Sequence, residues 1–198
     1  MIKTIALGLM SGTSLDGVDA VAVDFSGDKP KLVGHSHLDF DRDLRKTLLA
    51  LCKPGDNEIE TMQDAAVQLS KTYAHAIHEL LNEADIPRSA VAAAGVHGQT
   101  IRHRPEKGWT LQLSNPALIA ELSGVDVIAD FRSRDMAAGG QDGSTCADTV
   151  LTMQADAFAE GSAGNLPTGR FLPVDGTPMD FRKGRRIGDG LHLAYEQI

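Results

Sequence analysis

Hydroxyl and carboxylate side chains stand between two glycines in one short stretch near the start of the chain. Its residues are Gly12, Thr13, Ser14, Leu15, Asp16, Gly17, Val18 and Asp19. Glycines let the backbone turn with positive φ and bring its N–H groups close to an oxyanion. Hydroxyls donate to phosphate oxygens, and the Asp16 carboxylate can hold a hydrated Mg²⁺. The stretch predicts a phosphate-binding turn; the alternative is an ordinary hairpin with a tight Asp-Gly turn.

A second group of polar residues follows the apolar run 91–96, which is typical of a buried central strand. Open α/β sheets bind ligands at the carboxyl ends of such strands. Here Gly98 permits close approach, Gln99 offers a donor and an acceptor, and Thr100 follows. His97 could bind a hydroxyl or act as a base. We therefore expect a ligand-binding loop after this strand.

A third group follows the apolar run 125–129, which predicts another buried strand that delivers Arg132 to its carboxyl end. An arginine there is a candidate for a forked contact to a carboxylate or phosphate. The alternative is an ion pair, Asp130 with Arg132 or Arg134 with Asp135, that only fixes a loop.

Two histidine pairs could bind metal but are expected to be solvated. His35 and His37 would project from one face of a strand over 31–40, without a third ligand nearby. His75 and His78 lie one turn apart in a helical segment without a carboxylate in register, which favours a solvated or capping role.

Positioning these groups requires a series of elements that local patterns predict. They are a hairpin over 5–7 and 18–23, a strand over 31–40, helices over 44–51 and 58–84, strands over 91–96 and 109–113, a helix over 116–122 and a strand over 125–129. This order matches the ribonuclease-H-like α/β lobe of sugar kinases, actin and Hsp70, with a mixed sheet flanked by helices.

Composition excludes several classes. With a net charge of −8 and pI near 5.3, the chain offers no basic stripe for nucleic acid or an anionic membrane. Cys52 and Cys146 form no metal or disulfide framework. The N-terminus lacks a signal-peptide pattern, and no apolar run approaches the roughly 18 residues of a membrane helix. These features predict a cytoplasmic protein.

Three segments, 8–19, 97–100 and 129–141, closely resemble the anhydro-N-acetylmuramic acid kinases of bacterial cell-wall recycling. Members of that family open the 1,6-anhydro ring of the sugar with water and phosphorylate its 6-hydroxyl from ATP. The resemblance implies ATP phosphates on residues 12–19, Mg²⁺ as cofactor, and sugar contacts at 97–100 and Arg132. It also suggests a homodimer.

Residues 142–198 depart from the family pattern, so we expect a kinase lobe over 1–141 and an irregular tail after it. The expected catalytic Asp of the family's second lobe has no counterpart, and the catalytic base is therefore unassigned. Residues from about Asp142 are compatible with a frameshifted reading of the family sequence. The lobe alone is then expected to be inactive, and the alternative function is a non-catalytic remnant that binds sugar or a protein partner.

Overall fold

The computed structural model describes residues 4–27, 30–137, 170–172 and 194–196. The strands are β1 (Ile5–Ser11), β2 (Gly17–Asp24), β3 (Lys31–Asp39), β4 (Val91–Arg104), β5 (Trp109–Leu113), β6 (Val127–Ala129), β7 (Arg170–Leu172) and β8 (Ala194–Glu196). The helices are α1 (Arg42–Leu51), α2 (Glu58–Glu83), α3 (Pro116–Ser123) and α4 (Phe131–Ala137), with 3-10 turns at Arg88–Ala90 and Pro105–Lys107.

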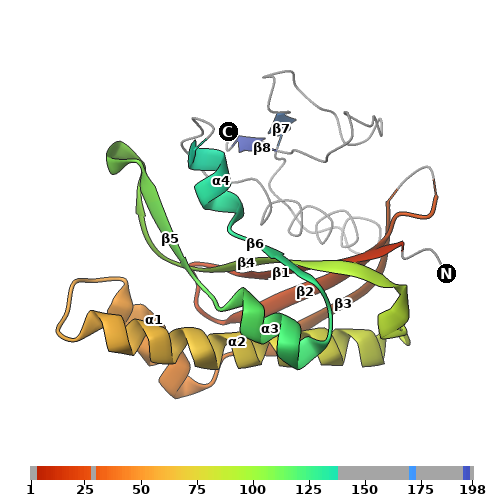
Figure 1. Cartoon of the computed structure of the whole chain (residues 1–198), viewed down its shortest axis with the longest axis horizontal. Helices are drawn as coiled ribbons and strands as arrows, with labels where there is room; N and C mark the ends of the chain where they lie inside the picture. Colours follow the sequence, from red (N-terminus) through yellow and green to blue (C-terminus); the bar gives the residue numbers. More distant parts are fainter. Residues whose placement is uncertain (1–3, 28–29, 138–169, 173–193, 197–198) are drawn as a thin grey trace, which may run out of the picture.

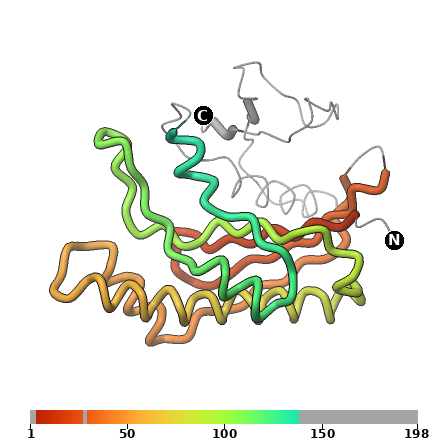
Figure 2. Tube along the Cα trace, viewed as in Figure 1, coloured from red at the N-terminus to blue at the C-terminus, as the bar shows by residue number. Residues whose placement is uncertain are grey.

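The main sheet has the strand order β3-β2-β1-β4-β5, and β6 pairs with β4 beside this path. Strands β1, β2 and β3 are antiparallel, whereas β4 runs parallel to β1 and β6 runs parallel to β4. Figure 2 shows β1 and the first half of β4 side by side although they are far apart in sequence. This mixed sheet, flanked by helices, confirms the predicted ribonuclease-H-like α/β lobe.

Helices α1, α2 and α3 lie below the sheet in Figure 1, and α2 contributes buried side chains to the core on this face of the sheet. Leu69, Tyr73, Ile77 and Leu80 recur at helical spacing and are fully buried. Burial of one such side chain contributes about 1.5–3 kcal/mol, so this face holds α2 on β2 and β3. Helix α4 rises on the opposite side of the sheet (Figure 1).

Local capping signals set the ends of the shorter helices. The Asp41 carboxylate accepts from the backbone N–H groups of Asp43 and Leu44, which starts α1 two residues before the predicted position. The Asn115 side chain caps α3, Pro116 takes its first position, and Gly124 closes it in the left-handed conformation, as predicted.

The structure corrects three predicted strands. Strand β1 does not end at residue 7 but continues to Ser11. Strand β4 does not end at residue 96 but continues to Arg104, because its second half pairs antiparallel with β5. Strand β6 covers only Val127–Ala129 and is not buried, since Ile128 is 55% exposed. Val125 and Asp126, which were predicted as strand, lie between the Gly124 cap of α3 and β6, and Asp130, with φ of 64°, turns the chain into α4.

Strands β7 and β8 pair antiparallel as a separate two-stranded sheet. They are the parts of the predicted irregular tail that the structure describes; the rest of that prediction lies outside the described residues. None of the described helices is long and apolar enough to cross a membrane.

Candidate functional site

Two of the three polar segments meet where the parallel pairing of β1 and β4 ends. Ser11, the last residue of β1, is in register with Gln99 of β4. The Gln99 side chain is 1% exposed, and its Nε2 donates to the carbonyl of Gly12 at 3.1 Å. The amide group therefore ties the start of the β1–β2 loop to β4. The prediction that His97 to Thr100 form a loop after the strand is wrong, because these residues lie inside the continuous strand β4.

The β1–β2 loop covers residues 12–16, so Gly17, Val18 and Asp19 belong to β2. The expectation that its glycines take positive φ is wrong: Leu15 does so, with φ of 53°. Leu15 is also 4% exposed, and burial of its side chain in the core keeps the residue in this conformation. Thr13, Ser14 and Asp16 remain exposed, so the loop presents its polar side chains to solvent while Leu15 anchors it.

Gly17 is required for close packing. A Cβ atom there would lie 2.4 Å from the carbonyl oxygen of Leu38 and 2.8 Å from Nε2 of His37. The absence of a side chain therefore lets β3 approach the start of β2.

The Asp16 carboxylate is held in place from within the loop. It accepts from the Ser14 hydroxyl at 2.7 Å and from the Gly17 N–H at 3.1 Å. The Ser14 hydrogen bond is the largest cause that lowers the pKa of Asp16 below its usual value. Asp16 therefore offers an ionised, exposed carboxylate at neutral pH.

Asp19 lies in a second polar cluster, which β3 completes. Nδ1 of His37 lies 2.9 Å from the Asp19 carboxylate, and Nε2 of His37 lies 3.3 Å from Asp39. His35 approaches Asp19 at 3.9 Å. The two histidines share one exposed face, as predicted, and contact carboxylates there. Asp19 is thus directed toward β3 as part of this cluster.

His97 is 8% exposed and has one satisfied ring nitrogen. Its Nδ1 donates to the carbonyl of Gly98 at 2.7 Å, which fixes the proton on Nδ1. Nε2 is buried without a hydrogen-bond partner among the described residues. Burial lowers the pKa of His97, and the nearby Arg132 charge acts in the same direction. Neutral His97 therefore presents Nε2 as an acceptor.

Arg132 joins the site from α4. Its guanidinium donates to the Thr100 hydroxyl at 3.2 Å, and Nε2 of Gln112 on β5 donates to the same oxygen at 3.1 Å. The structure thus brings Arg132 to Thr100 of the second segment, as its predicted position after β6 required. The sequence prediction missed Gln112, because a glutamine in an alternating strand carries no signal of its own.

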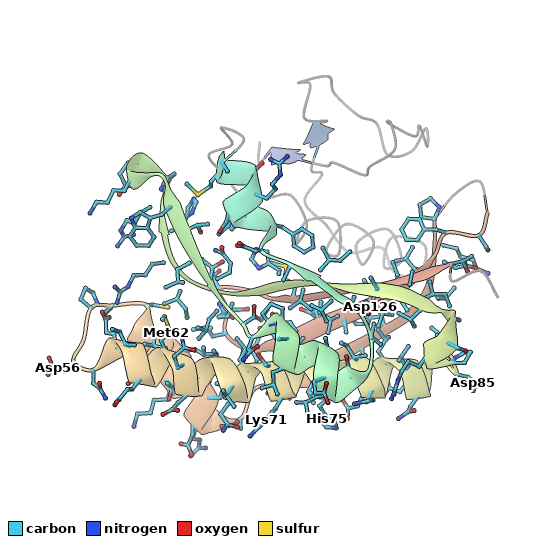
Figure 3. All side chains as sticks on the ribbon, viewed as in Figure 1. Asp56, Met62, Lys71, His75, Asp85 and Asp126 are labelled. Carbon is cyan, nitrogen blue, oxygen red and sulfur yellow. The ribbon has the colours of Figure 1, made fainter. Side chains whose placement is uncertain are left out.

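The helix histidines have structural partners. Nε2 of His78 hydrogen bonds to the Leu122 carbonyl at 3.1 Å, in agreement with the predicted capping role. His75 lies on the side of α2 turned away from the sheet (Figure 3) and contacts Glu79, four residues later, at 3.5 Å. The prediction that His75 has no carboxylate in register is therefore wrong. Among the described residues, no group of three or more His, Cys, Asp or Glu side chains could hold a metal ion.

Comparison with known proteins agrees with the resemblance that segments 8–19, 97–100 and 129–141 suggested. The family model for anhydro-N-acetylmuramic acid kinase matches residues 4–160. Proteins named anhydro-N-acetylmuramic acid kinase from Albidiferax ferrireducens and Paraburkholderia xenovorans are 57% and 58% identical over 139 and 135 residues. Each alignment covers 68% of this chain and 36% of the relative.

A relative of the same name from Burkholderia vietnamiensis is 48% identical over 177 residues, which cover 87% of this chain and 46% of the relative. The chain thus spans between about a third and a half of the length of these curated relatives. The matched family range extends past Gln141, the predicted end of the kinase lobe, to residue 160. The resemblance inferred from the three segments is confirmed, and the chain belongs to the anhydro-N-acetylmuramic acid kinase family.

Proposed function

We propose that this chain is part of an ATP-dependent phosphotransferase that acts on 1,6-anhydro-N-acetylmuramic acid. Water opens the anhydro ring, and the 6-hydroxyl receives the γ-phosphoryl group, which gives N-acetylmuramic acid 6-phosphate. Family membership supports the kinase class. The observation that carries the proposal is the hydrogen bond from Gln99 to Gly12, because it joins the candidate phosphate loop to the candidate sugar segment.

The β1–β2 loop supplies groups suited to a nucleotide. Thr13 and Ser14 are exposed hydroxyl donors, and Asp16 is an ionised carboxylate. Mg²⁺ is usually held by one or two carboxylates together with phosphate oxygens and water, so one carboxylate here fits a magnesium nucleotide. When bound, Mg²⁺ neutralises charge on the phosphates. Asp16 would hold it, and the Thr13 and Ser14 hydroxyls with backbone N–H groups of the loop would hold the phosphates, whereas Asp19 contacts His37 and is not available to them.

The second segment supplies groups suited to a sugar. His97 Nε2 and Gln99 Oε1 are buried acceptors without partners among the described residues. Gln99 cannot exchange its amide atoms, because Nε2 donates to the carbonyls of Gly12 and Thr100. Two such acceptors call for hydroxyl or amide donors, which an amino sugar carries. Gly98 and Thr100 complete this segment, and Arg132 would contact a carboxylate or oxyanion of the sugar.

The decisive experiment uses the purified chain with Mg·ATP and the anhydro sugar. Saturable binding of both Mg·ATP and the sugar supports the proposal, with or without product, because the chain alone is expected to be inactive. Sugar binding without Mg·ATP binding supports the non-catalytic alternative, and absence of binding to either ligand contradicts the proposal. The catalytic base stays unassigned, and a cytoplasmic location, a homodimer and the boundary at residue 141 stay predictions.

Arg132 allows a matched test of the sugar site, because Arg134 is an exposed arginine of the same helix. Arg132→Gln is expected to weaken sugar binding about 10- to 100-fold, the effect of losing a charge-assisted hydrogen bond. Arg134→Gln should leave the dissociation constant unchanged. Equal losses in both variants, measured by calorimetry, would contradict the assignment of Arg132.

A further inference from the structure

Tyr73 is an unexpected polar group beneath the candidate site. The residue lies on the apolar face of α2 and is 0% exposed. Its hydroxyl oxygen lies 2.9 Å from Oγ of Ser11, the last residue of β1 before the loop. A buried hydroxyl is costly unless it is hydrogen bonded, so this contact fixes where the end of β1 lies over α2.

Strand β4 lies beside this contact, because Ser11 is in register with Gln99. Burial raises the pKa of Tyr73 far above its usual value, while the hydrogen bond with Ser11 acts in the opposite direction. The phenol therefore stays protonated at neutral pH. Gly98, which precedes Gln99, has φ of 76°, so β4 departs from regular strand geometry at this point.

Ser11 directly precedes one proposed ligand segment, and Gly98 lies inside the other. Ser11 precedes Gly12 of the candidate nucleotide loop, and Gly98 lies between His97 and Gln99 of the candidate sugar segment. The Gln99 side chain connects the same two segments through its hydrogen bond to the Gly12 carbonyl. The Gln99 side chain thus ties together two segments more than eighty residues apart, and Tyr73 holds the residue before one of them against α2.

We propose that Tyr73 is a positioning residue, whose hydroxyl holds Ser11 at the end of β1 against α2 and, through the pairing of Ser11 with Gln99, fixes where the candidate nucleotide loop lies relative to the candidate sugar segment. This inference rests on the proposed function, because it takes the two segments as ligand sites. Phosphoryl transfer requires the reacting atoms to be held close and in line, so a variable separation would impair both binding and transfer.

The test uses the full chain and the variant Tyr73→Phe, which removes one oxygen and keeps the ring that fills the core. Backbone amide exchange at residues 11–16 and 97–100 is expected to accelerate about tenfold, the scale of one lost buried hydrogen bond, while exchange in β3 is unchanged. The affinity for Mg·ATP should fall by a similar factor, since the loop is less often in its binding arrangement.

Ser70→Ala is the matched control. Ser70 is a fully buried hydroxyl one turn earlier on α2, and it accepts from the Asn115 backbone N–H at 2.8 Å, at the start of α3 and not at β1. This variant should lower global stability comparably without local acceleration at residues 11–16. The double variant Ser11→Ala with Tyr73→Phe should exchange no faster at residues 11–16 than Tyr73→Phe alone.

The outcomes separate the two proposals. Wild-type exchange at both segments in Tyr73→Phe, or the same uniform acceleration as in Ser70→Ala, overturns the positioning role. Local acceleration with unchanged Mg·ATP affinity also overturns it. Failure of the wild-type chain to bind Mg·ATP and the anhydro sugar overturns the proposed function, and the exchange data then still decide whether Tyr73 fixes the two segments.

Discussion

Two histidines of this chain lie in opposite environments, and their pKa values move in opposite directions. His97 on β4 is buried, which lowers its pKa. His37 on β3 is 36% exposed, and its hydrogen bond to Asp19 is the largest cause that raises its pKa. The sequence predicted the exposed face of His37, but it did not predict the burial of His97, which was expected in a loop after the strand.

The comparison shows two ways to order polar side chains on one sheet. Around His97 the partners are backbone carbonyls, an amide and a phenol, so geometry depends on hydrogen bonds in a dry environment. Around His37 the partners are carboxylates in contact with solvent, so geometry depends on charge. The first arrangement is sensitive to shape, and the second is sensitive to pH and salt.

The largest expected effect comes from changing shape beside His97. A Cβ atom at Gly98 would lie 2.8 Å from the carbonyl oxygen of Leu113, in a residue whose φ is 76°. Gly98→Ala should lower the free energy of unfolding by about 2–4 kcal/mol. Gly108 has a φ of 72° with open space around it, so Gly108→Ala should cost only about 1–2 kcal/mol. Equal midpoint shifts in urea would show that close approach at Gly98 is unimportant.

The second prediction concerns acid. Because the folded-state pKa of His97 is lowered, the unfolded chain takes up a proton first as pH falls below the usual value of 6.5. The His97 contribution is present above pH 6.5 and is lost as pH falls through the lower folded-state pKa. Its slope cannot exceed about 1.4 kcal/mol per pH unit for one proton. The free energy of unfolding is measured in urea for wild type and His97→Gln at a series of pH values below 6.5. The same dependence of this free energy on pH in both proteins would contradict the prediction.

The smallest expected effect has the opposite sign. His37 has a raised folded-state pKa, so its contribution is fully present below pH 6.5 and is lost as pH rises through the higher folded-state value. Exposed ion pairs contribute at most about 1 kcal/mol and are screened by salt. Wild type should lose stability above pH 6.5 relative to His37→Gln at low salt, and 1 M salt should remove most of the difference. A salt-independent difference would mean that charge is not the cause.

Local signals can predict the elements whose ends are set by their own residues. Asn115, Pro116 and Gly124 indicated both ends of α3, whereas the prediction missed Asp41 as the N-cap of α1. The helical spacing of Leu69, Tyr73, Ile77 and Leu80 gave α2 within one residue. Such signals act within one or two turns, which is why they can be recognised in a single sequence.

The sequence could not show what depends on distant partners. The sequence predicted that β4 ends at residue 96, whereas the strand continues to Arg104. The extension depends on pairing with β5, which a local pattern does not show. Leu15 takes the left-handed conformation expected of a glycine because the core holds its side chain. Tyr73 was recognised as a core residue, but periodicity cannot distinguish a phenol that contacts Ser11 from a plain apolar ring. The roles of the two ligand segments were suggested by resemblance, and their proximity came from the fold.

The parallel pairing of β1 with β4 also has a consequence for synthesis of the chain. Strand β1 can form its hairpin with β2 as soon as the first few dozen residues have left the ribosome, but its other edge pairs with residues 91–99. That edge stays open until α2 and the start of β4 have been made. An open strand edge with apolar neighbours can pair with other chains. We therefore expect nascent chains that stop before residue 91 to aggregate, and chains that include β4 to be protected.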